Sequence, residues 1–256
     1  MKYITIPPPP HLKPYVRFFW ALEYYLAADE PNYIYRSVAD SCAEIIFHYK
    51  GAFDILTDNG VEKSWRSGFH FQSAQYNRFI TSENFGIFGA YIYPYAVPAL
   101  FGLPADEGSN QMLDLKTFLG NTAHELEERI MLAADNHQRA VILSNFIERR
   151  LQNIRIKDEG AIASVHHVIH SGQNHTVAQL ADRYNLSVRQ FDRKFKQYAG
   201  FSPKLYLRIT RLHEALQQYG SSKSLTQIAL DCGYYDQSHF IHDVKAFTGY
   251  HPGYYF

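Results

Sequence analysis

Two passages in the second half of the chain have the same construction. The first runs from Leu180 to Gly200 as LADRYNLSVRQFDRKFKQYAG, and the second runs from Asp231 to Gly249 as DCGYYDQSHFIHDVKAFTG. Each passage predicts the end of a short helix, a tight turn and a second helix whose apolar residues recur every four positions. We therefore predict two helix-turn-helix units, with their second helices near residues 187–199 and 236–248.

The second helix of each unit has an apolar side and a polar side. At 100° per residue, Phe191, Phe195 and Tyr198 of the first unit point inward, as do Phe240, Val244 and Phe247 of the second. Arginine can fork onto guanine, glutamine onto adenine, and shorter hydroxyls onto several base edges, so the outward residues suit the DNA major groove. The alternative is an ordinary solvated helix face. The candidate DNA-binding residues are Arg189, Gln190, Asp192, Arg193, Lys196, Gln237, Ser238, His239, His242 and Lys245.

Three of these candidates have a second interpretation. Asp192 can accept a hydrogen bond from cytosine or simply hold Arg189 or Lys196 in position. His239 and His242 are either ordinary exposed histidines or base contacts that change as histidine titrates between about pH 5 and 8. A comparison of DNA affinity at pH 6 and pH 8 separates these two hypotheses.

A long helix between the two units explains why the passage occurs twice. Ser202 and Pro203 are a helix start signal, and the helix is expected to run from Pro203 to about Tyr219, which is roughly 25 Å. Such a spacer can hold the second helices of the two units, called the reading helices below, at a distance of about one DNA turn, near 34 Å. One chain can then use two successive major grooves, with Lys196 and Lys245 on phosphates.

The passages from Leu186 to Gln218 and from Ser224 to Tyr255 resemble the C-terminal domain of the AraC/XylS family of bacterial transcription regulators. The resemblance covers about a hundred residues and implies an all-α domain of about seven helices that binds double-stranded DNA. It assigns Arg189, Gln190, Asp192, Arg193, Gln237, Ser238, His239 and His242 to the reading surface. One departure is clear, because His242-Asp243-Val244-Lys245 stands where the family has an R-x-F-K pattern.

The first part of the chain predicts a different structure. Short aromatic and β-branched runs separated by Gly, Pro, Asn and Asp predict a barrel or sandwich, followed by two helices at about 122–154. Serine or threonine with Glu or Gln three residues later suggests capping boxes at Thr122, Thr176, Ser187 and Ser224. The polar segment KDEG at Lys157–Gly160 marks a boundary. We predict an α+β chain with a β-rich domain at 1–157 and a DNA-binding domain at 158–256.

The N-terminal segments PPPHLKPYVRFFWALE, SCAEIIFHY and YPYAVPALFGLPADE also resemble a known domain. It is the domain of unassigned function that a subset of AraC/XylS regulators carries. The resemblance implies a cupin-like barrel that senses a small-molecule effector or mediates homodimerisation, and it makes RNA polymerase a plausible partner. Phe18, Phe19, Trp20, Tyr24, Tyr25, Tyr91, Tyr93 and Tyr95 are either core or pocket, with a pocket expected where tyrosines meet Trp65 or Arg66.

Charge and composition narrow the function further. The net charge is zero, but the residues from Gly172 onward carry ten Lys and Arg against six Asp and Glu, as expected of a DNA-binding part. Apolar runs are too short for a membrane helix and the N-terminus lacks a signal-peptide core, so we expect a cytoplasmic protein with no membrane partner. Cys42 and Cys232 allow no disulfide framework.

An enzyme is the alternative from another class. A cupin-like small-molecule or metal enzyme, with the helical domain as an accessory, would need a His-x-His pair with a carboxylate nearby. His48 and His70 instead stand on separate predicted strands, and His11 follows a proline run. No phosphate loop, nucleophile elbow or HExxH motif is present. We therefore expect no enzyme activity, no cofactor and no metal.

Overall fold

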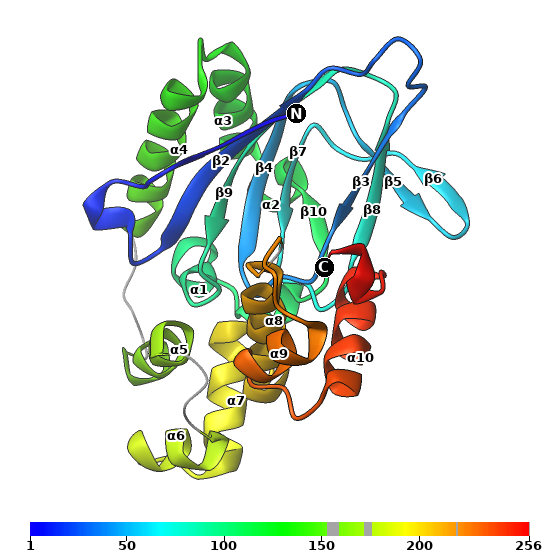
Figure 1. Ribbon diagram of the computed structural model, residues 1–256. Coiled ribbons are helices and arrows are strands. Elements are labelled where there is room, and N and C mark those ends of the chain that lie inside the picture. Colours follow the sequence, from blue (N-terminus) through cyan, green and yellow to red (C-terminus); the bar gives the residue numbers. More distant parts are fainter. Residues whose placement is uncertain (153–158, 172–175, 219, 256) are drawn as a thin grey trace.

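Ten strands in the first half of the chain form two sheets in the computed structural model, which describes residues 1–152, 159–171, 176–218 and 220–255 (Figure 1). The six-stranded sheet has the order β1-β2-β9-β4-β7-β10, and the four-stranded sheet has the order β3-β8-β5-β6. Every strand pair is antiparallel. The strands are β1 (Lys2–Ile6), β2 (Val16–Tyr24), β3 (Tyr33–Ser37), β4 (Ala43–Lys50), β5 (Asp54–Thr57), β6 (Gly60–Glu62), β7 (Ser67–His70), β8 (Asn77–Thr81), β9 (Phe85–Ile92) and β10 (Met112–Asp114).

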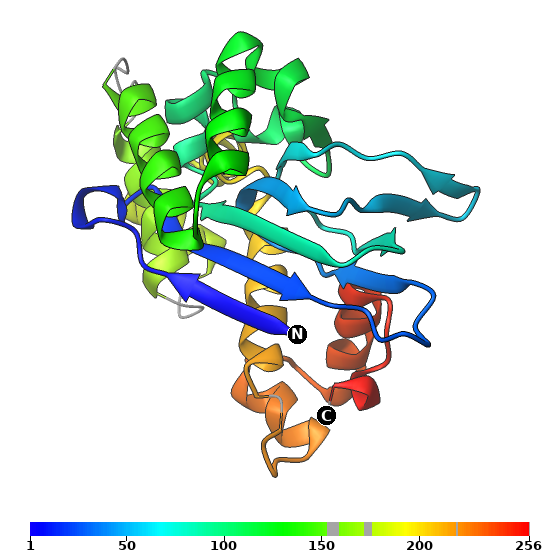
Figure 2. The same ribbon diagram turned by 90° about the horizontal axis from the view of Figure 1, so that it is seen from above.

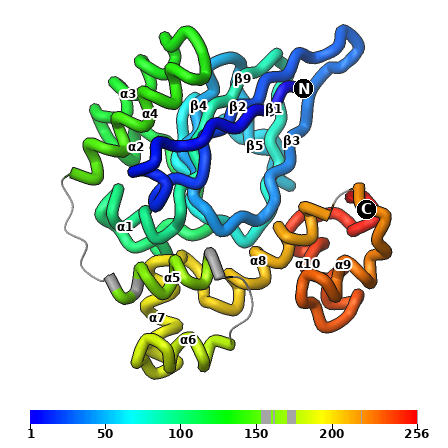
Figure 3. The backbone as a smooth tube through the Cα atoms, turned by 60° about the vertical axis from the view of Figure 1, so that its left-hand side comes forward, coloured from blue at the N-terminus to red at the C-terminus, as the bar shows by residue number. Residues whose placement is uncertain are grey.

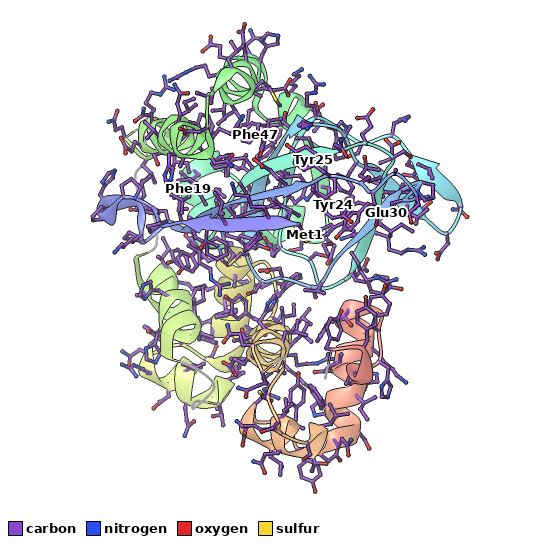
Figure 4. The ribbon with its side chains drawn as sticks, turned by 45° about the horizontal axis from the view of Figure 1, so that its top comes forward. Met1, Phe19, Tyr24, Tyr25, Glu30 and Phe47 are labelled. Atoms are coloured by element: carbon purple, nitrogen blue, oxygen red, sulfur yellow. The ribbon has the colours of Figure 1, made fainter. Side chains whose placement is uncertain are left out.

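The central strands of the six-stranded sheet are apolar on both faces, because each face is covered. Side chains alternate along a strand, so Phe19 and Phe47 point to one face, where they pack under helices, as Figure 4 shows. Trp20 and Ile46 point to the other face, where they meet Phe79 of the four-stranded sheet and Phe53, which directly precedes β5. The expected β-rich domain is confirmed as two facing sheets.

Four α-helices and one 3-10 helix follow β9 in the part of the N-terminal half that the structure describes. They are α1 (Ala96–Phe101), η2 (Ala105–Gly108), α2 (Leu115–Leu119), α3 (Asn121–Leu132) and α4 (Asn136–Leu151). α3 and α4 lie against the outer face of the six-stranded sheet (Figures 1 and 2). The two expected helices are present, but the capping box at Thr122 was wrong. Gly120, at φ +61°, ends α2 and lets α3 begin at Asn121, so Thr122 already lies inside the helix.

The second half of the chain is helical throughout its described residues. Six α-helices and the 3-10 helix η3 (Pro252–Tyr254) follow one another, and the C-terminal all-α part is therefore as expected. Of the boundary segment Lys157–Gly160, Lys157 and Asp158 lie outside the described residues, and α5 begins at Glu159. The α-helices are α5 (Glu159–Ser171), α6 (Val177–Arg183), α7 (Val188–Ala199), α8 (Pro203–Leu216), α9 (Leu225–Asp231) and α10 (Gln237–Thr248).

The spacer helix α8 is shorter than the sequence indicates. It begins at Pro203, with Ser202 as its N-cap, and ends at Leu216 after 14 residues, which is about 21 Å. Tyr219, the expected end, lies outside the described residues. α8 packs against both α7 and α10, which lie on opposite sides of it (Figures 1 and 3).

The first helix-turn-helix unit shares a hydrophobic core with the β-rich half. Phe191 and Phe195 of α7 are fully buried in the same cluster as Phe69 of β7 and Leu100 of α1. The second unit has a separate core around Phe240 and Ile228, which takes in only Ala39 among the fully buried apolar residues of the β-rich half. Both reading helices therefore belong to cores that include residues of the N-terminal half.

No helix among the described residues is long and apolar enough to cross a membrane. Across residues 1–152, 159–171, 176–218 and 220–255, no three His, Cys, Asp or Glu side chains gather in a way that would hold a metal ion.

Candidate nucleic-acid interface

The first reading helix, α7, starts where the sequence predicts. The Ser187 hydroxyl accepts a hydrogen bond from the Gln190 backbone N–H, and the Gln190 side chain accepts one from the Ser187 N–H, which completes a capping box. Asn185 supplies the left-handed turn before it, at φ +52°. Arg189, Gln190, Arg193 and Lys196 are exposed, and Asp192 is half-buried. Gln190 is thus partly occupied as a cap, which leaves its amide nitrogen for a ligand.

The second reading helix, α10, begins with a different cap. The Asp236 carboxylate accepts from the His239 backbone N–H at 2.7 Å. Ser238, His242 and Lys245 are exposed, whereas Gln237 and His239 are half-buried. The Gln237 side chain accepts a hydrogen bond from the Thr226 hydroxyl of α9 at 3.1 Å, so this side chain also helps to join the two helices of its unit.

The capping signals elsewhere in the domain are partly confirmed. Thr176 and Gln179 form the expected reciprocal box at α6. Ser224 caps α9 by accepting from the Gln227 backbone N–H, but the Gln227 side chain donates to Asp231 at 2.6 Å instead of returning to Ser224. The box at Ser224 is therefore half formed.

A buried ion pair joins α10 to α8, and sequence reasoning missed it. Asp243 is fully buried and receives two hydrogen bonds from Arg208, at 2.6 and 3.2 Å. These bonds raise the pKa of the Arg208 guanidinium. His242 Nδ1 lies 3.5 Å and His239 Nε2 lies 3.9 Å from the Asp243 carboxylate. The signal available in the sequence was the acid at position 243, which stands at the variable position of the family's R-x-F-K, next to His242 in place of its arginine.

Each reading helix ends at a glycine that contacts the β-rich half. Gly200 and Gly249 both have left-handed backbones, at φ +80° and +73°, which favours glycine. A Cβ on Gly200 would overlap the Gln72 side chain, and one on Gly249 would overlap Arg36 and Tyr76. The close approach therefore requires glycine at both positions.

Hydrogen bonds fix these two contacts. Ser109 donates its hydroxyl to the Gly200 carbonyl at 2.7 Å. Arg36 donates to the Thr248 carbonyl at 3.2 Å, and the Ala39 N–H donates to the Phe247 carbonyl at 2.9 Å. The Arg36 guanidinium also lies over the rings of Tyr76 and Tyr250, with its carbon 4.8 and 3.9 Å from their centroids. The β-rich half thus holds the C-terminal end of both reading helices.

Comparison with known proteins identifies the two helix-turn-helix units as part of a known domain. A family model described as a helix-turn-helix domain matches residues 180–256. Over 64 residues the chain is 47% identical to the HTH-type transcriptional activator RhaS of Pectobacterium carotovorum. The C-terminal part of the chain is an AraC-type helix-turn-helix domain. A second model, a domain of unknown function (DUF6597), matches residues 4–114, as the N-terminal resemblance implied.

The matches to RhaS proteins cover only part of each chain. The P. carotovorum match covers 24% of this chain and 22% of that protein. RhaS of Escherichia fergusonii is 36% identical over 89 residues, which is 32% of each chain. The chain therefore matches a third or less of the length of these relatives. Among solved structures, ToxT from Vibrio cholerae is similar with a TM-score of 0.50 and 14% identity, covering 93% of this chain and 97% of that one. This likeness concerns the fold alone, a β-rich half followed by a helical half.

Proposed function

We propose that this protein is a transcription regulator that binds double-stranded DNA by sequence, with its AraC-type domain reading two successive major grooves. The observation that carries the proposal is the pair of capped helices, α7 and α10, each with a polar outer side on its own helix-turn-helix unit. An outer side with exposed Arg189 and Arg193 suits base edges, and exposed Lys196 and Lys245 suit phosphates.

The β-rich half acts on DNA binding through the ends of the reading helices. Because Gly200 and Gly249 both rest on it, any change in the segments around Arg36 and Ser109 reaches α7 and α10. An effector bound in this half, or a homodimer formed through it, would change the position of the reading helices. We place the two functional units at 1–157 and 158–256, in a cytoplasmic protein that acts on RNA polymerase at its target promoters and has no catalytic role.

Selection of bound fragments from a random DNA pool tests the proposal. The expected result is a motif with two elements about one helical turn apart, since two units read neighbouring grooves. Retention of DNA without any motif, at a strength that depends only on salt, would contradict sequence-specific reading.

Replacing Arg193 with alanine should relax the preference at one base position of that motif. If Arg193 forks onto guanine, the loss at the selected site is about 1–3 kcal/mol, or about 5- to 150-fold in affinity. Lys196→Ala is the matched comparison on the same helix, because it also removes one exposed cation. It should weaken all sequences alike and reduce the salt dependence. Affinities of both variants for the selected site and for single-base variants of it, at two salt concentrations, decide the assignment.

A further inference from the structure

A cavity of about 180 Å³ lies between the two sheets of the β-rich half. Aromatic side chains, with Trp20, Tyr35, Phe53, Phe79 and Tyr91 among them, line it together with polar residues, and His213 of α8 contributes from the AraC-type domain. An apolar protein cavity of about 150 Å³ accommodates benzene. This cavity therefore accommodates one aromatic ring with a short side chain. The sequence placed a pocket near Trp65 or Arg66, and neither residue lines it.

The alternation of strand β4 brings a carboxyl group into this cavity. Ala43, Ile45 and Phe47 pack toward the helices, so the intervening Glu44 and His48 face the space between the sheets. Among the described residues, Glu44 Oε1 and His48 Nδ1 are buried and have no hydrogen-bond partner. An unpaired buried polar atom is costly in a folded protein, and a ligand with hydrogen-bond donors would satisfy the Glu44 oxygen.

The charges around the cavity favour a cation. Asp40 and Glu44 both line the cavity, and an anion would have to lie against them. The imidazoles of His48 and His70 give no compensating charge, because burial lowers their pKa values to about 4 and about 3. The guanidinium of Arg36, which also lines the cavity, stacks on Tyr76 and Tyr250 and donates to the Thr248 carbonyl, although its Nε has no hydrogen-bond partner among the described residues.

The environment of Glu44 favours its protonated carboxyl, and a bound cation would favour the ionised form. Burial, and then the nearby Asp40 carboxylate, raise the pKa of Glu44 to about 8, whereas the Tyr91 and Trp20 donors act in the opposite direction. An ammonium group beside Glu44 would favour the ionised carboxylate. The rings of Trp20 and Tyr91, with centroids 6.5 Å apart, offer the faces on which a cation is attracted.

We propose that the cavity between the two sheets is a binding site for a small aromatic amine, with its ammonium group on Glu44 and its ring among Trp20, Phe53 and Tyr91. The site lies apart from the DNA-reading surface. Binding of the amine does not depend on the proposed DNA function, whereas its role as an effector does.

The cavity also adjoins the contacts that hold the reading helices. Arg36 and Asp40 line it, and the segment between them bonds to the end of α10. His213 Nε2 lies 2.8 Å from the Ala39 carbonyl and 3.6 Å from Asp40. On another side, Phe71 and Ser73 flank Gln72, the residue against which Gly200 packs. A ligand in the cavity would therefore touch the segments that hold both α7 and α10.

Calorimetric titration of the full-length protein with phenethylamine tests the site. Two probes of closely similar size, 2-phenylethanol and phenylacetate, replace the ammonium with a neutral and an anionic group. We expect one phenethylamine per chain, with at least tenfold weaker binding of the alcohol and the acid. Equal binding of the three probes, or no binding of phenethylamine, would overturn the proposal.

The Glu44→Gln variant removes the charge and keeps the shape. It should bind phenethylamine at least tenfold more weakly, while Glu62→Gln, the same change at an exposed position of β6, should bind it as the unmodified protein does. Unchanged binding by Glu44→Gln would place the amine elsewhere. If Glu44→Gln does not fold, the three-probe comparison on the unmodified protein still shows whether the site prefers the amine. DNA binding by the same samples shows separately whether the regulator function holds.

The pH dependence of phenethylamine binding separates direct pairing with Glu44 from a purely structural role of this residue. Below pH 8 the carboxyl must lose its proton to pair with the amine, so the affinity should rise by up to about tenfold per pH unit from pH 6 and level off near 8. The other titratable and charged groups around it are Tyr3, Tyr35, Arg36, Asp40, Cys42, His48, His70, Tyr91 and His213. A slope that persists in Glu44→Gln would assign the titration to one of these groups and contradict the proposal.

Discussion

Replacing Phe195 with alanine is expected to lower the free energy of unfolding of the whole protein by about 3–5 kcal/mol. Phe195 is fully buried in α7, and it packs with Phe191 and Tyr206 at ring-centroid distances of 5.8 and 5.6 Å. Its cluster continues without interruption into the β-rich half. Thermal unfolding should therefore shift downward by roughly 10 °C as one transition, in both the helical and the sheet signals.

Val188→Ala is the control for this prediction. Val188 lies on the same helix but is 52% exposed, so its replacement should leave the midpoint nearly unchanged. Two separate transitions in the Phe195→Ala protein, with only the helical one displaced, would show that the shared core does not couple the two halves.

Replacing Asp243 with alanine should destabilise the second helix-turn-helix unit by about 2–3 kcal/mol. Removing one partner of a buried pair costs about 3–5 kcal/mol when the other charge stays buried. Arg208 is 28% exposed and can turn partly to water, which reduces the cost. The selected DNA motif should lose its second element, since α10 depends on this pair for its attachment to α8.

Two further proteins test the cause. Asp182→Ala removes an exposed aspartate of α6 and should change neither the stability nor the motif by much. Replacing Arg208 and Asp243 together with methionine and leucine should recover most of the stability, because it leaves no unpaired buried charge. Failure of the double variant to recover would point to the nearby His239 and His242, rather than to the ion pair, as the source of the loss.

Local signals were enough to predict the helical domain. The capping box of Ser187 and Gln190 acts within a few residues and lies where the sequence placed it, and Asn185 and the terminal glycines act equally locally. The ends of elements were less certain, since α8 stops at Leu216, before the expected end. The short strands β1, β3, β6 and β10 give little local signal, since three to five residues carry too little pattern and pairing with a distant strand decides them.

Contacts between distant parts of the chain had no local signal. Asp243 was not counted among the inward residues of α10, because an acid there makes sense only once Arg208, 35 positions earlier, is known to meet it. Glu44 alternates with apolar neighbours and could have been noticed as an inward carboxyl. Its burial in the cavity, however, depends on Trp20 and Tyr91 from other strands. Nothing around Arg36 indicates that it reaches Thr248.

The glycine contacts at the two helix ends also limit which operators the protein can use. Shifting one half of a bipartite operator by a single base pair moves it about 3.4 Å along the duplex and turns it by roughly 34°. A chain whose two reading helices were joined only by a flexible linker could adjust to that shift. Here Gly200 and Gly249 are fastened to one β-rich half, at Gln72 and at Arg36. The spacing between half-sites should therefore be as strictly specified as the bases themselves.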